Sequence, residues 1–168
     1  MKDAWAIAGY NFKEDDGSLP GIEFSSLTPT SVCTLFEYFR THGRIVSESA
    51  TLYVKSRLAD VPIADVDDPS GMVVDGTAYP FIVCFGGISF GGVPLPEIGV
   101  FVFDDCIELD YRMGSIWNRQ NVDAFFRLLV HLKRLVPESV IQSAANEGLP
   151  YPVEFNTALA QYSASIDQ

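Results

Sequence analysis

The stretch Glu97–Pro137, EIGVFVFDDCIELDYRMGSIWNRQNVDAFFRLLVHLKRLVP, contains the two patterns that decide the fold. Its first part, Ile98–Tyr111, consists of two apolar arms around Asp104-Asp105, a pattern typical of a β-hairpin. With a turn at these aspartates, three pairs of apolar side chains share one face: Val102 with Ile107, Val100 with Leu109, and Ile98 with Tyr111. A slip of one residue would turn the acids inward, so the pattern also specifies the register.

The opposite face of this hairpin is mixed in character. It pairs Phe101 with Glu108 and Gly99 with Asp110. Glu108 and Asp110 therefore point the same way from one strand, about 7 Å apart, which is near the spacing of a catalytic acid/base pair. Any solvated strand face carries acids in the same alternation, so a structural or binding role is the favoured interpretation.

After Met113-Gly114 the period of the apolar pattern changes to between three and four residues, which predicts a helix near 118–136. Asn118 is suited to cap this helix, and Pro137 ends it. A second helix is predicted near 29–42, because Thr28-Pro29 provides a cap and a first-turn proline.

Weaker patterns complete the predicted elements. Strands are expected at 4–12, 50–56 and 79–85, the last of them apolar on both sides and therefore central. Residues 60–76 are expected to form mostly turns with a short strand at 72–74, and a short amphipathic helix is expected at 153–163. The prediction is a single α+β domain over 1–168. It has a single antiparallel or mixed sheet with two main helices packed on it and a short C-terminal helix.

Composition limits the class of protein. With 168 residues and 48% apolar content, the chain can build a full core without metal or disulfides. Its three cysteines, Cys33, Cys84 and Cys106, are odd in number and far apart, which favours buried free thiols in a reducing compartment. No apolar run approaches the roughly 18 residues of a membrane span, and no targeting segment is recognisable. We therefore expect a cytoplasmic protein without a membrane partner.

Charge is distributed unevenly along the sequence. The formal net charge is −11, and residues 58–111 contain ten acids but no lysine or arginine. These acids are Asp60, Asp65, Asp67, Asp68, Asp75, Glu97, Asp104, Asp105, Glu108 and Asp110. A field of one sign repels nucleic acid and attracts cationic partners, although acids on turns also serve solubility.

The sequence contains no recognisable catalytic or metal-binding motif. The only two histidines, His42 and His131, have no adjacent nucleophile motif. The acids Asp65, Asp67 and Asp68 resemble the start of a calcium loop but lack its glycine and its final glutamate. No catalytic residue, metal site or cofactor is therefore predicted, and nothing indicates an oligomeric state.

The run Ile107–Gly114, followed by Trp117 and the apolar helix in a compact acidic chain, resembles small acidic bacterial immunity proteins of toxin–immunity systems. The resemblance implies a protein that occludes a toxin and does no chemistry itself.

The leading hypothesis is therefore a non-enzymatic protein-binding module that neutralises a basic protein partner, such as a toxin, through an acidic surface. Two alternatives remain: a small hydrolase or carbohydrate-active enzyme that uses paired carboxylates, and a phage-derived structural or assembly subunit. Acids that would steer the partner and aromatic residues that would anchor it form the candidate site: Asp67, Asp68, Phe101, Asp104, Asp105, Glu108, Asp110, Tyr111 and Trp117.

Overall fold

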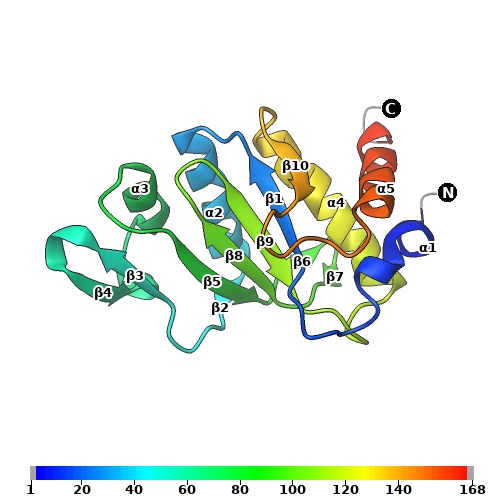
Figure 1. Cartoon of the computed structure of the whole chain (residues 1–168), viewed down its shortest axis with the longest axis horizontal. Coiled ribbons are helices and arrows are strands. Elements are labelled where there is room, and N and C mark those ends of the chain that lie inside the picture. The colour runs from blue at the N-terminus through cyan, green and yellow to red at the C-terminus, as the bar shows by residue number, and fades with distance from the viewer. Residues whose placement is uncertain (1–2, 166–168) are drawn as a thin grey trace.

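The computed structural model describes residues 3–165, which form an α+β fold on a six-stranded antiparallel sheet (Figure 1). The strand order is β10-β1-β9-β8-β5-β2. These strands are β1 (Gly21–Ser25), β2 (Arg44–Ile45), β5 (Phe81–Gly86), β8 (Ile98–Val102), β9 (Ile107–Tyr111) and β10 (Val140–Ser143). Two short hairpins lie outside this sheet: β3 (Thr51–Val54) with β4 (Ala59–Pro62), and β6 (Ser89–Phe90) with β7 (Val93–Pro94).

The hairpin β8–β9 has the predicted register. Val102 lies opposite Ile107 and Ile98 opposite Tyr111. The Phe103 N–H donates to the Cys106 carbonyl (3.0 Å), so Asp104 and Asp105 form the two-residue turn. The face that was predicted to be apolar is buried along both strands. The alternation of buried residues with half-buried or exposed ones continues on β1 and β5.

The described helices are α1 (Ala4–Ala8), α2 (Pro29–His42), α3 (Pro69–Val74), α4 (Arg119–Leu135) and α5 (Pro152–Ala164). The two long helices, α2 and α4, were predicted within a residue or two, as was α5. The Asn118 side chain accepts hydrogen bonds from the Gln120 and Asn121 N–H groups, which satisfies two donors of the first turn of α4. The Thr28 hydroxyl does the same for Ser31 at the start of α2 (3.2 Å).

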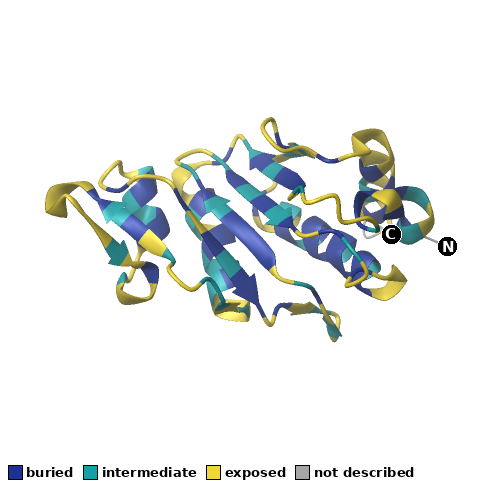
Figure 2. Cartoon of the chain, turned by 60° about the horizontal axis from the view of Figure 1, so that its bottom comes forward, coloured by how far each residue is buried: buried dark blue, intermediate teal, exposed yellow. Residues whose placement is uncertain are grey.

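Helices α2 and α4 lie behind the sheet in Figure 1, and α1 and α5 lie together beside α4. The core between these layers is rich in aromatic rings. The ring of Phe12 lies 4.9 Å from those of both Tyr111 and Trp117, and Phe126 lies 4.8 Å from Phe155 of α5. The opposite face of the sheet has no helix over it (Figures 1 and 2).

The prediction of a strand at 4–12 was wrong, because this segment forms α1 and a short 3₁₀ helix. The Asp3 carboxylate accepts a hydrogen bond from the Ala6 N–H (3.1 Å) and caps the helix. Ala4, Ala8 and Phe12 are buried, at the four-residue spacing of a helix face. Ala4, Ala6 and Ala8 alternate along the sequence as the residues of one strand face do, and this alternation led to the wrong prediction.

The prediction for 60–76 also needs correction. Residues 59–62 form β4, and the expected strand at 72–74 is part of α3, which Asp68 caps by accepting a hydrogen bond from the Gly71 N–H (3.0 Å). Strand β5 exists but is not central, since only the two-residue β2 separates it from the sheet edge. Its residue Ile82 is 47% exposed. Strands β1 and β10 were not predicted.

Candidate functional site

The side of the sheet that no helix covers, called the open face below, carries the side chains that alternate with the core. One row crosses five strands and is fixed by the strand register. It runs through Gln142, Glu23, Glu108, Phe101 and Ile82. The neighbouring row crosses four strands and runs through Gly21, Asp110, Gly99 and Cys84. The sheet therefore gathers residues from distant parts of the sequence onto one surface.

This open face is acidic, because it carries Glu23, Glu108 and Asp110. The strands β10, β1, β9, β8 and β5 contain no lysine or arginine. Arg44 lies on β2, at the far edge of the sheet. Among residues 3–165, Glu23, Glu108 and Asp110 have no basic side chain within ion-pair distance. The ion pairs that are seen, such as Arg127 with Asp123 (3.0 Å), involve helices or the start of the chain.

Burial and the neighbouring acids raise the pKa of two carboxylates on the open face, those of Glu108 and Asp110. Burial, followed by the charges of Asp110, Glu23 and Glu147, raises the pKa of Glu108. Burial and the charge of Glu147 likewise raise the pKa of Asp110, against a lowering contribution from the Gly99 backbone N–H. Both groups are therefore less stable as anions than they would be in water.

Two glycines make room for these carboxylates. A Cβ atom at Gly99 would overlap the carboxylate of Asp110, its cross-strand neighbour. A Cβ atom at Gly21 would lie 2.5 Å from Oε1 of Glu108. Both carboxylates therefore fold down against the backbone of adjacent strands instead of extending into solvent.

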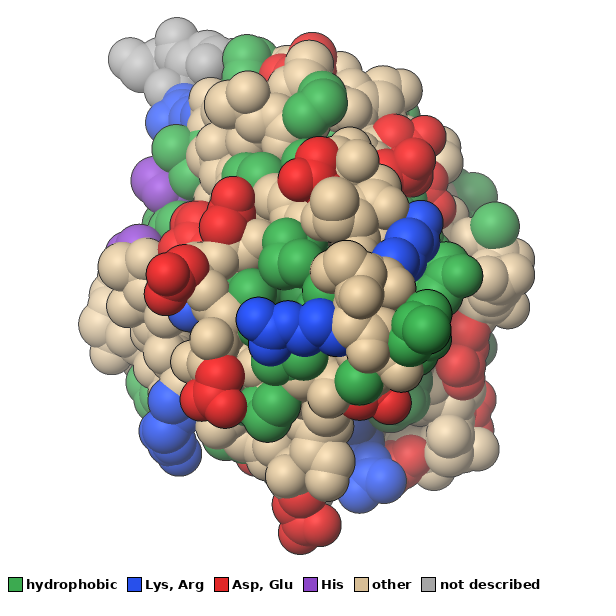
Figure 3. All heavy atoms as spheres, turned by 90° about the vertical axis from the view of Figure 1, so that its left-hand side faces the viewer, with side chains coloured by type: hydrophobic (Ala, Val, Ile, Leu, Met, Phe, Trp, Pro, Cys, Tyr) green, Lys and Arg blue, Asp and Glu red, His purple; other side chains and the backbone are tan. Residues whose placement is uncertain are grey.

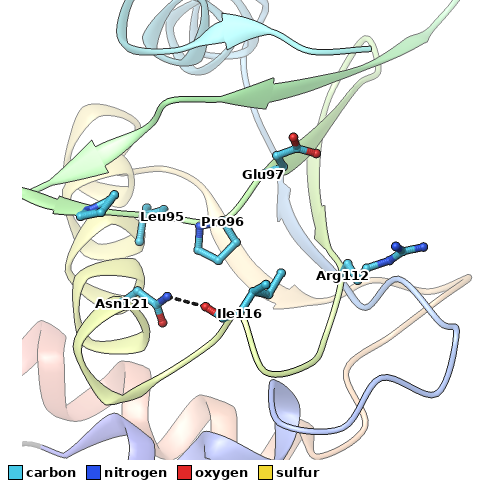
Figure 4. A pocket seen from close by; sticks show the side chains of 7 residues that line it. Leu95, Pro96, Glu97, Arg112, Ile116 and Asn121 are labelled. Atoms are coloured by element: carbon cyan, nitrogen blue, oxygen red, sulfur yellow. Dashed lines mark hydrogen bonds between the residues drawn. The ribbon is translucent and has the colours of Figure 1, made fainter. Parts of the chain in front are cut away.

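Asp110 lies in a cavity of about 300 Å³ at one end of the open face, called the Asp110 pocket below. Six of the side chains around it are those of Leu19, Ile82, Cys84, Glu97, Asp110 and Arg112. A second hollow of about 490 Å³ adjoins it and shares Glu97 and Arg112. Figure 4 shows this second hollow, in which the Asn121 amide donates to the Ile116 carbonyl (2.8 Å) and Glu97 and Arg112 do not point toward each other.

The structure brings five of the predicted site residues to the open face or its edge. Glu108, Asp110 and Phe101 lie on the face, and Asp104 and Asp105 are exposed at the turn that ends β8. The ring of Phe101 stacks on that of Phe103 at 4.5 Å, with 8° between their planes. This pair forms an aromatic patch beside the row of acids.

The prediction that Tyr111 and Trp117 anchor a partner does not fit their positions, because both are core residues. They are only 2% and 3% exposed. The Tyr111 hydroxyl donates to the Asn11 carbonyl (2.9 Å), and the Trp117 indole N–H donates to the Arg112 carbonyl (2.8 Å). Aromatic character had suggested an interface, but both rings pack on Phe12, and we leave them out of the candidate surface.

Asp67 and Asp68 lie apart from the open face, at the start of α3. There the surface is mixed in charge, and Figure 3 shows acidic, basic and hydrophobic side chains interspersed over this end of the molecule. The Arg40 guanidinium donates to the carbonyl oxygens of Val66 (2.9 Å) and Asp67 (2.8 Å). Arg40 of α2 thus brings a basic side chain to a segment whose own sequence has none. The charge at this end of the molecule is therefore not of a single sign.

Sequence reasoning missed the acids Glu23, on β1, and Glu147, in the loop after β10. The Glu147 carboxylate accepts a hydrogen bond from the Leu19 N–H (2.8 Å) next to the open face. Glu23 could have been found, because Ile22, Glu23, Phe24 and Ser25 alternate as a short half-buried strand does. No local signal marks Glu147.

In the described part of the chain, the other chemically reactive side chains, those of the cysteines and His42, have structural roles. The three cysteines are free, and burial, as the largest cause, raises the pKa of Cys84 to about 11 and that of Cys106 to about 12. Both are therefore neutral thiols near pH 7, not nucleophiles. His42 stacks on Tyr38 (4.1 Å). Within residues 3–165, no acid, histidine or cysteine cluster is arranged to hold a metal, and no helix has the length and apolarity to cross a membrane.

No protein-family model and no curated protein sequence matches the chain. Among solved structures, its fold is similar to that of the T6SS protein PA0821 of Pseudomonas aeruginosa, with 10% sequence identity and a TM-score of 0.36. The match covers 82% of this chain and 47% of that protein, so the chain spans about half the length of the structure that it matches. A likeness at this TM-score carries no inference about function.

Proposed function

We propose that this chain is a non-catalytic protein-binding module whose open face binds a basic protein, in the manner of an immunity protein that occludes its toxin. The observation that carries the proposal is the row of Glu23, Glu108 and Phe101 on adjacent strands, without a base on those strands. It places negative charge beside an aromatic patch on a surface that no helix covers.

The charge and the aromatic patch have different roles in this proposal. The exposed acids Asp104 and Asp105, at the edge of the face, speed the approach of a cationic partner. Affinity comes from the less polar residues Phe101, Phe103 and Ile82, because buried aromatic anchors dominate interface energies. Cations from the partner would also relieve the repulsion between Glu108 and its neighbours.

A paired-carboxylate hydrolase is less well supported. Its favouring observation is that Glu108 and Asp110 share a face and both have a raised pKa. Of the two, however, only Asp110 lines the 300 Å³ pocket. Glu108 faces Glu23 and Phe101 on neighbouring strands, so the two carboxylates do not flank one common cavity.

The test compares variants of the open face in a capture experiment. The wild-type chain is used to capture partners from a lysate of its own host, beside Glu23→Gln/Glu108→Gln and the control Glu48→Gln/Glu154→Gln. The control pair removes the same charge from exposed positions outside the open-face rows. We expect a basic protein that wild type and control retain and the open-face variant loses. Equal capture by all three would contradict the proposal.

Binding kinetics then separate steering from anchoring. With the captured protein, the association rate should fall as salt rises, because the screening length is only about 8–10 Å near physiological ionic strength. Asp104→Asn/Asp105→Asn should slow association and change dissociation little, whereas Phe101→Ala should mainly speed dissociation. An unchanged association rate in the aspartate variant would leave these acids as a solubility device.

A further inference from the structure

The Asp110 pocket differs from the rest of the open face because it is a cavity that combines two carboxylates with apolar walls. Asp110 and Glu97 supply the carboxylates, while Leu19 and Ile82 are 40% and 47% exposed around them. Lysine and arginine side chains have the matching form, an aliphatic stem that packs on apolar surface and a cationic head that pairs with carboxylates. The volume of about 300 Å³ is at the lower limit of ligand pockets and suits one side chain.

The charges around Asp110 are not balanced within the chain. The groups that act on its carboxylate are the burying protein atoms, the Glu147 charge and the Gly99 N–H, with no base among them. Arg112 lies at the exposed rim of the same pocket but makes no ion pair among residues 3–165. A cation that entered the pocket would therefore meet an uncompensated carboxylate.

The cross-strand neighbour of Asp110 determines where its carboxylate lies. The Gly99 residue opposite it has no side chain, and a Cβ atom there would occupy the space that the carboxylate uses. The carboxylate thus lies flat on β8, at the base of the pocket and not at its rim. A cation that pairs with this carboxylate must therefore come down onto the sheet.

We propose that the Asp110 pocket receives one lysine or arginine side chain of the basic partner, whose cationic head pairs with Asp110 and Glu97 while its stem lies along Ile82 and Leu19. This inference rests on the proposed function, because it names the anchor point of the same face. It also distinguishes Asp110 from Glu108 at this pocket: Asp110 contacts the entering side chain directly, whereas Glu108 does not line the pocket and acts on that side chain only through its charge.

The pocket can be tested without knowing the partner, by titrating the isotope-labelled 168-residue chain with short peptides in an NMR experiment. The probes are acetyl-Ala-Arg-Ala-amide and acetyl-Ala-Lys-Ala-amide, and the uncharged analogue with norleucine at the centre is the control. We expect shifts of the Cys84, Gly99 and Asp110 amides with the cationic peptides, and a lower pKa of the Asp110 carboxyl, because a bound cation favours the anion. The norleucine peptide should produce neither effect.

The decisive comparison is Asp110→Asn against Glu108→Gln, which remove the same charge from positions two residues apart on one strand. Asp110→Asn should weaken binding of the cationic peptides at least tenfold, and Glu108→Gln less than threefold. Equal effects of the two variants, or shifts spread along the Glu23 row without the pocket, would overturn the proposal. Asp110→Asn is expected to fold, since its carboxylate is already disfavoured as an anion.

Failure of the anchor at Asp110 can be told apart from failure of the proposed binding function. If Asp110→Asn binds the peptides as wild type does while open-face variants still lose the host partner, the binding function stands and the anchor is refuted. If the pocket binds the peptides but no host protein depends on the open face, the pocket stands as a cation site and the partner proposal fails.

Discussion

Replacing Gly99 with alanine should have opposite effects on stability depending on residue 110. In an Asp110→Ala background the new methyl group meets no carboxylate. Gly99→Ala should then raise the free energy of unfolding by about 0.5–1 kcal/mol, because glycine is unfavourable within a strand. With Asp110 present, the methyl group overlaps the carboxylate, which must rotate away.

Rotating the carboxylate away costs free energy. Forcing the carboxylate off its preferred rotamer, with the strand shift that the overlap imposes, should cost about 2 kcal/mol, within the roughly 1–3 kcal/mol typical of overpacked positions. Gly99→Ala alone should therefore lower the free energy of unfolding by about 1 kcal/mol. The coupling between the two positions is then about 2 kcal/mol, within the range that contacting residues show.

Urea unfolding of wild type, both single variants and the double variant at pH 7 measures this coupling. A change in stability of the same amount and sign in both backgrounds would refute the predicted coupling between residues 99 and 110. The peptide titration adds a second readout. A methyl group at residue 99 displaces the carboxylate from the base of the Asp110 pocket, so Gly99→Ala should also weaken binding of the cationic peptides.

Three further predictions concern stability. Asn11→Ala should cost about 3 kcal/mol in a urea titration, because this buried side chain makes three hydrogen bonds, two with Tyr151 and one with the Ala8 carbonyl. Leu129→Ala should cost roughly 2–5 kcal/mol in the same assay, since Leu129 is fully buried in α4. Asp110→Asn should raise the melting temperature at pH 7. The raised pKa means that folding disfavours the anion above the unfolded-state pKa, so this gain should vanish as pH falls below about 4. A gain that did not depend on pH would show that charge is not its cause.

The elements that the sequence predicted well are those with long and unambiguous patterns. Helix α4 has a cap at Asn118 and an apolar face repeated over four turns, and the hairpin has one register that buries its whole apolar face. Strand β1 is as short as β8 and β9, but it has no hairpin partner beside it in the sequence and pairs with β9 and β10, both far away. Its position depends on those partners, which no local pattern reveals. Ala4–Ala8 is ambiguous because alanine fits either period.

The candidate site shows the same division between local and non-local information. Alternation along one strand was enough to place Glu108 and Asp110 on one face, and the register confirms it. A count of charge along the chain could not tell which acids share a surface, since Arg40 of α2 reaches Asp67 while Glu23 joins Glu108 from another strand. The role of Gly99 depends on the row across the sheet, because only there does its missing side chain leave space for Asp110. A residue that looks like a weak point in its own strand is thus what allows a carboxylate to lie at the base of a pocket.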